Sequence, residues 1–554
     1  MAALTRLENL GAAFGNLPTL PRLTLIALLA LLMFLPGFAT LPVTDRDEAR
    51  FLQASRQMVQ SGDPIDIRFQ DAPRYKKPVG IYWAQSAAAL LSGEAEDAPV
   101  WVFRLPSLLG AVAAVVLVAV TGAPLIGVGP AAVAAVLFAA SLVLGGEARI
   151  AKTDAVLLAL IMGMLAILAR LHMAKAPPTT RQFAWIFWVC FGLGILVKGP
   201  IAPMVAGLTM LTVSILRREA RWLHPLAAPL PMLAGFALFV PWLLAISAQS
   251  GGAFWQASVG DDLLSKAAAG QEGKGLPPGT YLVLLWLTFW PGSVVLAMAL
   301  PRIWRRRAEP AFVFLLAWLI PVWLLFEAVP TKLIHYTLPV YPALALLAVA
   351  GFLGAPLPLS RWARGAGVAL LLPGILLAGF GFSLLAQWQG PDGAVGLLVS
   401  AAALAVGFAV AAMVALHREY RLATVLLLTA TGAVLHAGIF TSLARLPALW
   451  PSVQIYEAAE AAVEGRDCAA PRLVGWGYSE PSLVWLGGRE TVLADGRAEL
   501  PVDLLADPCT IIARDSSATA ALPPNTTRIA QITGFAIGAG KQVRLDILQP
   551  EAIP

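Results

Sequence analysis

Residues 44–83, TDRDEARFLQASRQMVQSGDPIDIRFQDAPRYKKPVGIYW, decide the fold of this chain. This stretch is the first long polar interval, and it directly follows the first hydrophobic span of a mostly apolar sequence. A plain connector between two spans does not need so many ionisable groups. We therefore interpret the interval as the chemical centre and the apolar remainder as the scaffold that holds it.

Composition identifies the class of protein around this interval. The chain is 58% hydrophobic and 13% charged, with a mean hydropathy of +0.75, whereas soluble domains carry about 25% charged residues. Repeated apolar runs of about 20 residues indicate a polytopic α-helical membrane protein. The net charge of +6 is scattered in short clusters, and the sequence has no glycine-rich phosphate loop, so we expect no nucleic-acid partner.

The apolar runs predict about 13 transmembrane helices. The first run is longer than the apolar core of a signal peptide, which has about 7–15 residues, so we expect a retained helix. The expected spans are 23–41, 102–121, 126–146, 155–173, 183–197, 201–216, 227–248, 280–300, 311–328, 335–353, 366–387, 394–415 and 422–443.

Arginine clusters predict the orientation, because cytoplasmic loops carry an excess of Lys and Arg. The clusters recur at every second loop from the third cytoplasmic position onward. This pattern places 44–83, 249–279 and the C-terminal tail on the outside, which is the periplasm for a protein of a bacterial inner membrane. The marker residues are Arg170, Lys175, Arg181, Arg217, Arg218, Arg221, Arg302, Arg305, Arg306, Arg307, Arg361, Arg364, Arg418 and Arg421.

Two domains are predicted. Residues 1–444 form a transmembrane catalytic domain with periplasmic loops 42–100 and 249–279. Residues 445–554 form a small periplasmic α/β domain, because VQIYEAAEAAVEG is helix-like and several short runs alternate like strands. The strand-like runs are RLVGWGY, SLVWLGG, TIIARD, RIAQITGF and QVRLDIL.

The three cysteines rule out a disulfide-dense scaffold. Cys468 and Cys509 lie in the predicted periplasmic domain, where a disulfide that closes their loop would contribute roughly 3–4 kcal/mol. Two buried free thiols explain the same pair equally well. Cys190 lies in an apolar span and is interpreted as packing.

The ionisable residues assigned to the outer loops converge on one layer. Charge at the bilayer centre costs about 2.5–3.5 kcal/mol per residue, so charges of both signs near the surface favour a site for an anionic lipid head. Lys and Arg neutralise a phosphate, and a carboxylate acts as base towards an incoming hydroxyl. Besides the opening stretch, the contributors are Asp154, Lys198, Asp262, Lys266, Glu272, Lys274, Lys332, His335 and Tyr336.

Five motifs in fixed order, DEARF, RYKKP, ARIAKTDAVLL, GILVKGP and KLIHYTLPVYPALALL, carry a family resemblance. The chain resembles GT-C glycosyltransferases of the protein-mannosyltransferase-like branch and, within it, the ArnT-type lipid A aminoarabinose transferases. The resemblance implies a GT-C fold with a C-terminal periplasmic domain. It also implies inverting transfer of a sugar from a polyprenyl-phosphate carrier by direct displacement.

The resemblance also implies roles for individual residues. Asp47 is the expected general base or acceptor-positioning group, and Asp154 matches the family's second acidic position. Lys77 and Tyr336 are expected to contact the carrier phosphate, and Lys266 lies near a phosphate-binding arginine of the family. The remaining candidates are Glu48 for catalysis, Lys198 and Lys332 for the donor phosphate, and Asp45, Arg50, Tyr75, Lys76, Tyr82 and His335 for substrate.

One position departs from the family pattern. Where ArnT-like sequences read Glu-Lys-Pro, this chain reads Lys76-Lys77-Pro78. A carboxylate that would help to hold a divalent metal is replaced by a second cation, so we expect no metal site and no required cofactor. The sugar and the acceptor can also differ from those of aminoarabinose transfer.

Each candidate has a structural alternative. Asp47, Glu48 and Arg50 can form the polar face of an amphipathic helix that lies on the membrane. In that alternative, the apolar residues that face lipid are Phe51, Ala54 and Met58. The alternative leaves Asp45 and Asp47 unexplained, because we expect both to precede the helix.

Two further alternatives concern single residues. Thr153-Asp154 can be a helix N-cap, and Lys198 can anchor the end of a span by snorkelling. The aromatic residues at span ends are interpreted mostly as an interfacial belt.

Three functions are compatible with these features. The first is a monomeric enzyme that moves a sugar from undecaprenyl phosphate to lipid A or lipopolysaccharide core, with membrane lipids around it. The second is a protein O-glycosyltransferase. The third is a lipid or solute transporter, which we rank lower because the sequence has no internal repeat and its charges lie in outer loops.

Overall fold

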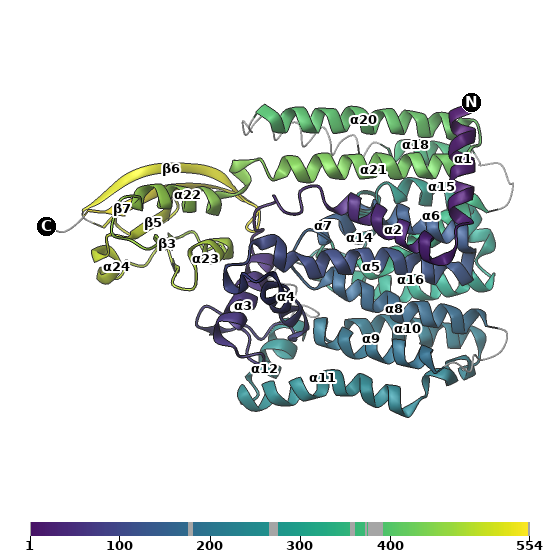
Figure 1. Ribbon diagram of the computed structural model, residues 1–554, viewed down its shortest axis with the longest axis horizontal. Helices are drawn as coiled ribbons and strands as arrows, with labels where there is room; N and C mark the ends of the chain where they lie inside the picture. Colours follow the sequence, from purple (N-terminus) through teal and green to yellow (C-terminus); the bar gives the residue numbers. More distant parts are fainter. Residues whose placement is uncertain are drawn as a thin grey trace.

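The computed structural model describes residues 2–174, 181–264, 275–354, 361–371, 374, 392–523 and 525–551. Long helices run side by side through most of the molecule, and a small sheet domain lies beyond one end of them (Figure 1). The segment α3–α4 lies at that same end, beside the sheet domain. The predicted fold class, a polytopic helical protein with a small C-terminal α/β part, is confirmed.

The helices follow the predicted apolar runs closely. Six described helices are long and apolar enough to cross a membrane, and five further apolar helices are shorter, so the predicted count of 13 is not confirmed. The predicted span 366–387 lies mostly outside the described residues. The helices are α1 Ala2–Gly15, α2 Thr19–Phe34, α5 Val100–Ile126, α6 Val128–Ala139, α7 Leu142–Glu147, α8 Asp154–Met173, α9 Gln182–Lys198, α10 Ile201–Arg217, α11 Pro229–Gln249, α12 Ala253–Trp255, α14 Thr280–Thr288, α15 Gly292–Arg306, α16 Pro310–Ala328, α17 Tyr341–Leu353, α18 Arg361–Ala369, α20 Asp392–His417 and α21 Arg421–Leu443.

One predicted span differs in shape. The run 280–300 forms two helices, α14 and α15, which meet at an angle of 118°. The break falls at residues 289–291, where the sequence reads Phe-Trp-Pro. Pro291 lacks the backbone N–H that a continuous helix would need at this point.

The centre of the bundle is formed by α5 and α8. Gly110 of α5 faces the start of α8, and a Cβ at this position would lie 2.8 Å from the backbone of Val156. Without a side chain at Gly110, the two backbones approach closely, as small residues permit between membrane helices. This packing fixes the N-terminal end of α8, where Asp154 begins the helix.

The polar interval folds into α3 Asp47–Ser61, a short hairpin of β1 Arg68–Phe69 and β2 Ala72–Pro73, and α4 Gly80–Ser92. Phe51, Ala54 and Met58 of α3 are buried against Tyr82 of α4 and against α9 and α11. They face protein rather than lipid, so the alternative of an amphipathic helix on the membrane surface is wrong. Asp47 does not precede the helix, as we had expected, but is its first residue.

The C-terminal part is a five-stranded mixed sheet with helices. Its strand order is β4-β3-β5-β7-β6; β3 is parallel to β4 and β5, and β7 is antiparallel to β5 and β6. The predicted strand SLVWLGG is wrong, because Pro481 starts a helix there. The elements are α22 Pro451–Val463, β3 Arg472–Trp476, α23 Pro481–Gly487, β4 Val492–Ala494, α24 Val502–Ala506, β5 Thr510–Asp515, β6 Thr526–Ala536 and β7 Lys541–Pro550.

Cys468 and Cys509 form a disulfide, with their Cα atoms 5.8 Å apart. They precede the neighbouring parallel strands β3 and β5, so the disulfide joins the starts of two adjacent strands. The two cysteines are therefore bonded and are not two buried free thiols. Cys190 is a free thiol in α9, close to Gly163 of α8.

The sheet domain contacts the polar interval through α23. The Arg56 guanidinium donates a hydrogen bond to the Trp485 carbonyl at 2.9 Å and stacks 3.4 Å from the centroid of the Trp485 ring. Asp45 accepts a hydrogen bond from the Ser482 backbone N–H at 3.3 Å. The segment α3–α4 is therefore held between the membrane helices and the sheet domain.

Candidate active site

A charged pocket lies where six separate parts of the chain meet. They are the start of α3, the turn before α4, the start of α8, the end of α9, the π-helical segment that contains Asp262 and the loop that contains His335. The lining residues are Asp47, Arg50, Phe51, Arg74, Lys76, Lys77, Lys152, Thr153, Asp154, Lys198, Asp262, Leu333, His335 and Tyr336.

Asp154 is the centre of an ion network on one wall of the pocket. Lys198 Nζ lies 2.6 Å from Asp154 Oδ1. Lys152 Nζ and His335 Nε2 lie 3.9 and 3.7 Å from Asp154 Oδ2. Thr153 makes no side-chain cap. A carboxylate at the first position of a helix is favourable by itself. The helix start therefore does not explain why two ammonium groups and an imidazole surround Asp154.

Glu147 extends this network below the pocket. Lys152 Nζ contacts Glu147 Oε1 at 2.9 Å and donates a hydrogen bond to His335 Nδ1 at 3.2 Å. Burial, together with the nearby charge of Asp154, raises the pKa of Glu147 to about 7. Burial lowers the pKa of His335 to about 3, so the imidazole is neutral and accepts from Lys152.

Lys77 lies on the opposite side of the pocket and pairs with Asp262. The distance from Lys77 Nζ to Asp262 Oδ2 is 2.6 Å. Asp262 is buried and belongs to a π-helical segment, Gln256–Leu264. Lys77 itself is half-buried, which leaves its ammonium within reach of a ligand in the pocket.

Glu48, the residue after Asp47, lies outside the pocket. Its carboxylate accepts hydrogen bonds from Arg104 Nε at 2.7 Å and Nη2 at 3.0 Å, and from the backbone N–H groups of Thr44 and Ala151 at 2.8 Å. Burial opposes the charge of Glu48, but Arg104 and these donors hold its pKa below the usual value. Both side chains are fully buried. The Glu48 oxygens are thus bound by Arg104 and by backbone N–H groups and do not line the pocket, and the expected catalytic role of Glu48 stays a prediction.

Four other candidates also lie away from the pocket lining. Lys332 Nζ donates to the carbonyls of Phe326 and Glu327 at 3.0 and 2.6 Å, so it closes the end of α16. Tyr75 donates to Asp66 at 2.7 Å. Tyr82 is fully buried in the α3–α4 core and Asp45 faces the sheet domain, while Lys266 lies outside the described residues.

The structure brings the other predicted residues together in one pocket. They are Asp47, Arg50, Lys76, Lys77, Asp154, Lys198, His335 and Tyr336.

Several pocket residues were missing from our list of candidate site residues. Arg74 and Phe51 lie inside the motifs RYKKP and DEARF, so their position beside predicted residues was an available signal. Lys152 and Asp262 were assigned to outer loops without a role. The pairing of Asp262 with Lys77 joins residues 185 apart in the sequence, and no local pattern predicts it.

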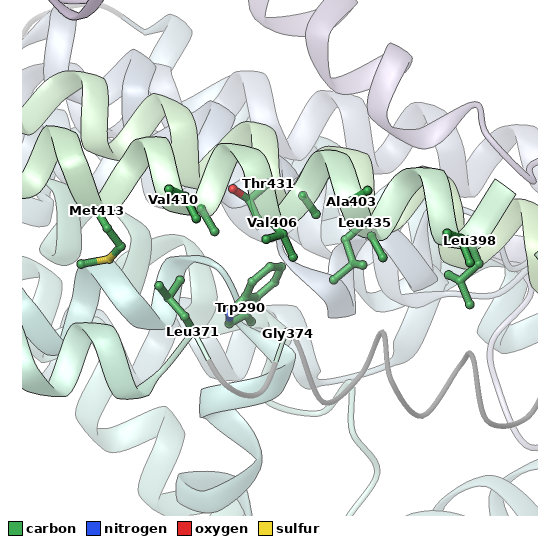
Figure 2. Close-up of a pocket in the computed structure, with 14 residues that line it drawn as sticks. Trp290, Leu371, Gly374, Leu398, Ala403, Val406, Val410, Met413, Thr431 and Leu435 are labelled. Atoms are coloured by element: carbon green, nitrogen blue, oxygen red, sulfur yellow. The ribbon is translucent and has the colours of Figure 1, made fainter. Parts of the chain in front are cut away.

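A second cavity, of about 570 Å³, is almost entirely apolar (Figure 2). Side chains of α20, including Val406 and Met413, face Trp290 and Leu371 across it. The hydroxyl of Thr431, which also lines it, donates to the carbonyl of Leu427 at 2.8 Å. The described residues that line it include no ionisable group, and so they offer no acid, base or cation for catalysis.

Comparisons with known proteins agree with this picture. Residues 76–244 match the family described as dolichyl-phosphate-mannose-protein mannosyltransferase. The undecaprenyl phosphate-alpha-4-amino-4-deoxy-L-arabinose arabinosyl transferase of Edwardsiella ictaluri is 28% identical over 354 residues, which cover 62% of this chain and 61% of that protein. The enzyme with the same description from Pectobacterium carotovorum is 26% identical, over 72% of this chain and 71% of that protein.

The likeness of fold extends further than the likeness of sequence. The crystal structure of ArnT from Cupriavidus metallidurans bound to undecaprenyl phosphate superimposes with a TM-score of 0.72 at 17% identity, over 94% of this chain and 97% of that one. The same protein in the apo state gives 0.72 at 19% identity, over 96% and 98%. The chain thus shares its fold with that ArnT protein.

Proposed function

We propose that this protein is an inverting glycosyltransferase. It moves a sugar from an undecaprenyl-phosphate carrier to lipid A or lipopolysaccharide core. The observation that carries the proposal is the pocket in which Asp47, Asp154, Lys77 and Tyr336 meet from four separate parts of the chain. The relatives described as undecaprenyl phosphate-aminoarabinose transferases support the choice of donor class.

Departure of the carrier phosphate is the step that needs cations. As the bond between the sugar and the phosphate oxygen breaks, that oxygen takes up the bonding electron pair and gains negative charge. Lys77 and Tyr336 line the pocket and are placed to stabilise this charge, the first as a cation and the second through its hydroxyl. Before the donor binds, the Lys77 ammonium pairs with the Asp262 carboxylate. When the donor binds, its phosphate replaces this carboxylate as the partner of Lys77.

The incoming hydroxyl needs a base. Asp47 is exposed at the first turn of α3, in the pocket lining, and receives the proton as the acceptor oxygen forms its bond to the anomeric carbon. Asp154 is held by Lys198 and Lys152, so it acts as a fixed negative charge that orients the acceptor or its cationic neighbours. Displacement from the face opposite the phosphate inverts the anomeric centre.

The reaction takes place on the periplasmic side of the bacterial inner membrane. The arginine clusters support this orientation. The disulfide between Cys468 and Cys509 supports an oxidising compartment for the C-terminal domain. On this basis residues 445–554 form a periplasmic domain that covers the α3 side of the site.

Catalysis proceeds without a required metal in this proposal. Lys76 occupies the position at which we expected a family glutamate, and among the described residues no group of three or more His, Cys, Asp or Glu side chains is arranged to hold a metal. A chelator such as EDTA should leave the transfer rate unchanged. Loss of activity that a divalent ion restores would contradict the proposal that no metal is required.

The test uses cells with and without the protein, and purified protein in nanodiscs. We expect lipid A to gain the mass of one sugar only in cells with the protein, and the purified protein to release polyprenyl phosphate. An unchanged lipid A mass together with glycosylated Ser or Thr residues would favour protein O-glycosylation. Movement of lipid across vesicles without release of polyprenyl phosphate would overturn the enzyme and favour a transporter.

A further inference from the structure

The pocket carries more positive charge than one carrier phosphate requires. Among the residues that the structure describes, six cationic side chains and three carboxylates line it, with His335 neutral. This is a formal excess of three positive charges before Glu147, which pairs with Lys152 from outside the lining, is counted. Lys77 and Lys198 already have carboxylate partners at 2.6 Å. A donor phosphodiester brings one negative charge. The excess therefore lies elsewhere in the pocket.

Two arginines, Arg50 and Arg74, account for much of this excess. Neither guanidinium forms an ion pair with a carboxylate among the residues that the structure describes. Burial, and then the neighbouring charge of Arg74, lowers the pKa of Arg50, while Asp47 offsets this in part. The two like charges therefore lie close enough to repel each other across one side of the pocket.

Arg74 is the more enclosed of the two. Its side chain is 7% exposed, and its Nε is buried without a hydrogen-bond partner among the described residues. Its guanidinium lies 5.2 Å from the centroid of the Phe51 ring, which also lines the pocket. The Tyr82 hydroxyl lies beside the Arg74 guanidinium but carries no charge to offset it. Buried polar groups in folded proteins are nearly always paired, and a buried charge without an opposite charge is costly. A ligand oxygen would satisfy this group.

We propose that Arg50 and Arg74 form a second anion-binding subsite, beside the carrier-phosphate contacts, for an oxyanion on one of the two substrates. The planar guanidinium donates two parallel hydrogen bonds to a carboxylate or a phosphate, and a pair of arginines suits such a group. The oxyanion is the carboxylate of a uronosyl donor or a phosphate on the acceptor lipid. A sugar with an ammonium group would face the same cations and is disfavoured. This inference rests on the proposed function.

The experiment measures equilibrium binding, so that it does not depend on turnover. Full-length protein in nanodiscs is titrated with farnesyl-phosphate glucuronic acid and with farnesyl-phosphate glucose, which differ by one carboxylate. In the second arm the probes are lipid A and its dephosphorylated form. Polyprenyl phosphate release is measured separately; if release fails while the charge preference holds, the proposed function fails and the subsite stands.

Arg50→Gln and Arg74→Gln test the assignment, with Arg74→Lys as the variant that keeps the charge. Arg68→Gln is the control, because Arg68 is half-exposed, pairs with Asp66 and lies outside the pocket. We expect the wild type to bind the anionic member of one pair about tenfold more tightly, and both Gln variants to lose this preference while Arg68→Gln keeps it. Preference in the first pair identifies the sugar carboxylate, and preference in the second pair identifies the acceptor phosphate.

Equal binding within both pairs by the wild type would overturn the subsite. A preference that survives unchanged in both Arg50→Gln and Arg74→Gln would overturn it as well. Because the first of these results comes from the wild type, it does not depend on whether the variants fold.

Discussion

Asp47 and Glu48 are neighbours in the sequence, yet their carboxylates lie in opposite surroundings. Glu48 is fully buried, and Arg104 and two backbone N–H groups bind its oxygens. Asp47 is exposed at the start of the same helix and faces a pocket lined by cations. Both belong to the motif DEARF, in the polar interval that we interpret from the sequence as the chemical centre.

The difference lies in whether the charges are matched inside the protein. Beside its bonds to Glu48, Arg104 donates hydrogen bonds to the carbonyls of Phe38, Leu41 and Pro42, at 3.1, 2.6 and 2.9 Å. That cluster is complete and ties the chain before α3 to α5. The described lining of the pocket has more cationic side chains than carboxylates, and in our proposal an outside anion binds there. We infer that the matched cluster maintains the fold and that the unmatched one binds substrate.

The largest effect is expected from breaking the matched cluster. Arg104→Ala leaves the Glu48 charge buried without its partner, which costs about 3–5 kcal/mol. We expect much less folded protein and a clearly lower melting temperature in detergent, measured by fluorescence-detected size exclusion. Arg68→Ala, which removes an exposed cation, serves as the control and should melt like the wild type. A wild-type melting temperature for Arg104→Ala would show that the cluster does not maintain the fold.

In the pocket, Lys77→Met should lower transfer by more than any loss of folded protein explains. Loss of one group that stabilises developing negative charge lowers turnover by about 100-fold. Because the substitution also removes the partner of the buried Asp262 carboxylate, turnover is expressed per folded molecule, with the melting temperature recorded on the same samples. Turnover is measured as polyprenyl phosphate release, and Lys541→Met, which replaces an exposed lysine at the start of β7, is the matched control. If Lys77→Met turned over like Lys541→Met, Lys77 would have no contact with the donor phosphate.

A smaller effect is expected from pH. The pKa of Glu147 is raised to about 7, so the group is neutral below pH 7 and negative above it. Its ionisation adds negative charge beneath the pocket, which weakens binding of an anionic donor as pH rises. We expect KM for the donor to rise several-fold between pH 6 and pH 8 in the wild type and to stay flat in Glu147→Gln. His335 does not change its protonation between pH 6 and pH 8, because burial lowers its pKa to about 3. An identical rise in both proteins would assign the titration to another group.

Much of the fold was predictable because apolar runs and arginine clusters report directly on membrane spans. The break between α14 and α15 was not, because the hydropathy of 280–300 is continuous across Pro291. SLVWLGG alternates like a strand, but Pro481 at its N-terminus sets a helix. The domain limits at 444 and 445 stay predictions.

The sequence predicted which types of residue form the site, but it did not predict which residues pair with one another. The motif DEARF contains two carboxylates, and their different fates depend on Arg104, which lies 56 residues after Glu48. The pairing of Lys77 with Asp262 and of Lys152 with Glu147 depends in the same way on how the helices pack. A sequence shows that charge gathers in outer loops, whereas only the packing shows which charges are matched.

The comparison of Asp47 with Glu48 is tested most directly by one measurement, polyprenyl phosphate release per folded molecule in Asp47→Asn and Glu48→Gln, with melting temperature recorded on the same samples. We predict that Asp47→Asn melts like the wild type and releases at least about 100-fold less polyprenyl phosphate, as expected for loss of a general base. Glu48→Gln should melt at a lower temperature and release polyprenyl phosphate at nearly the wild-type rate per folded molecule. Near-normal release by Asp47→Asn, or a stable Glu48→Gln that is inactive, would contradict this account.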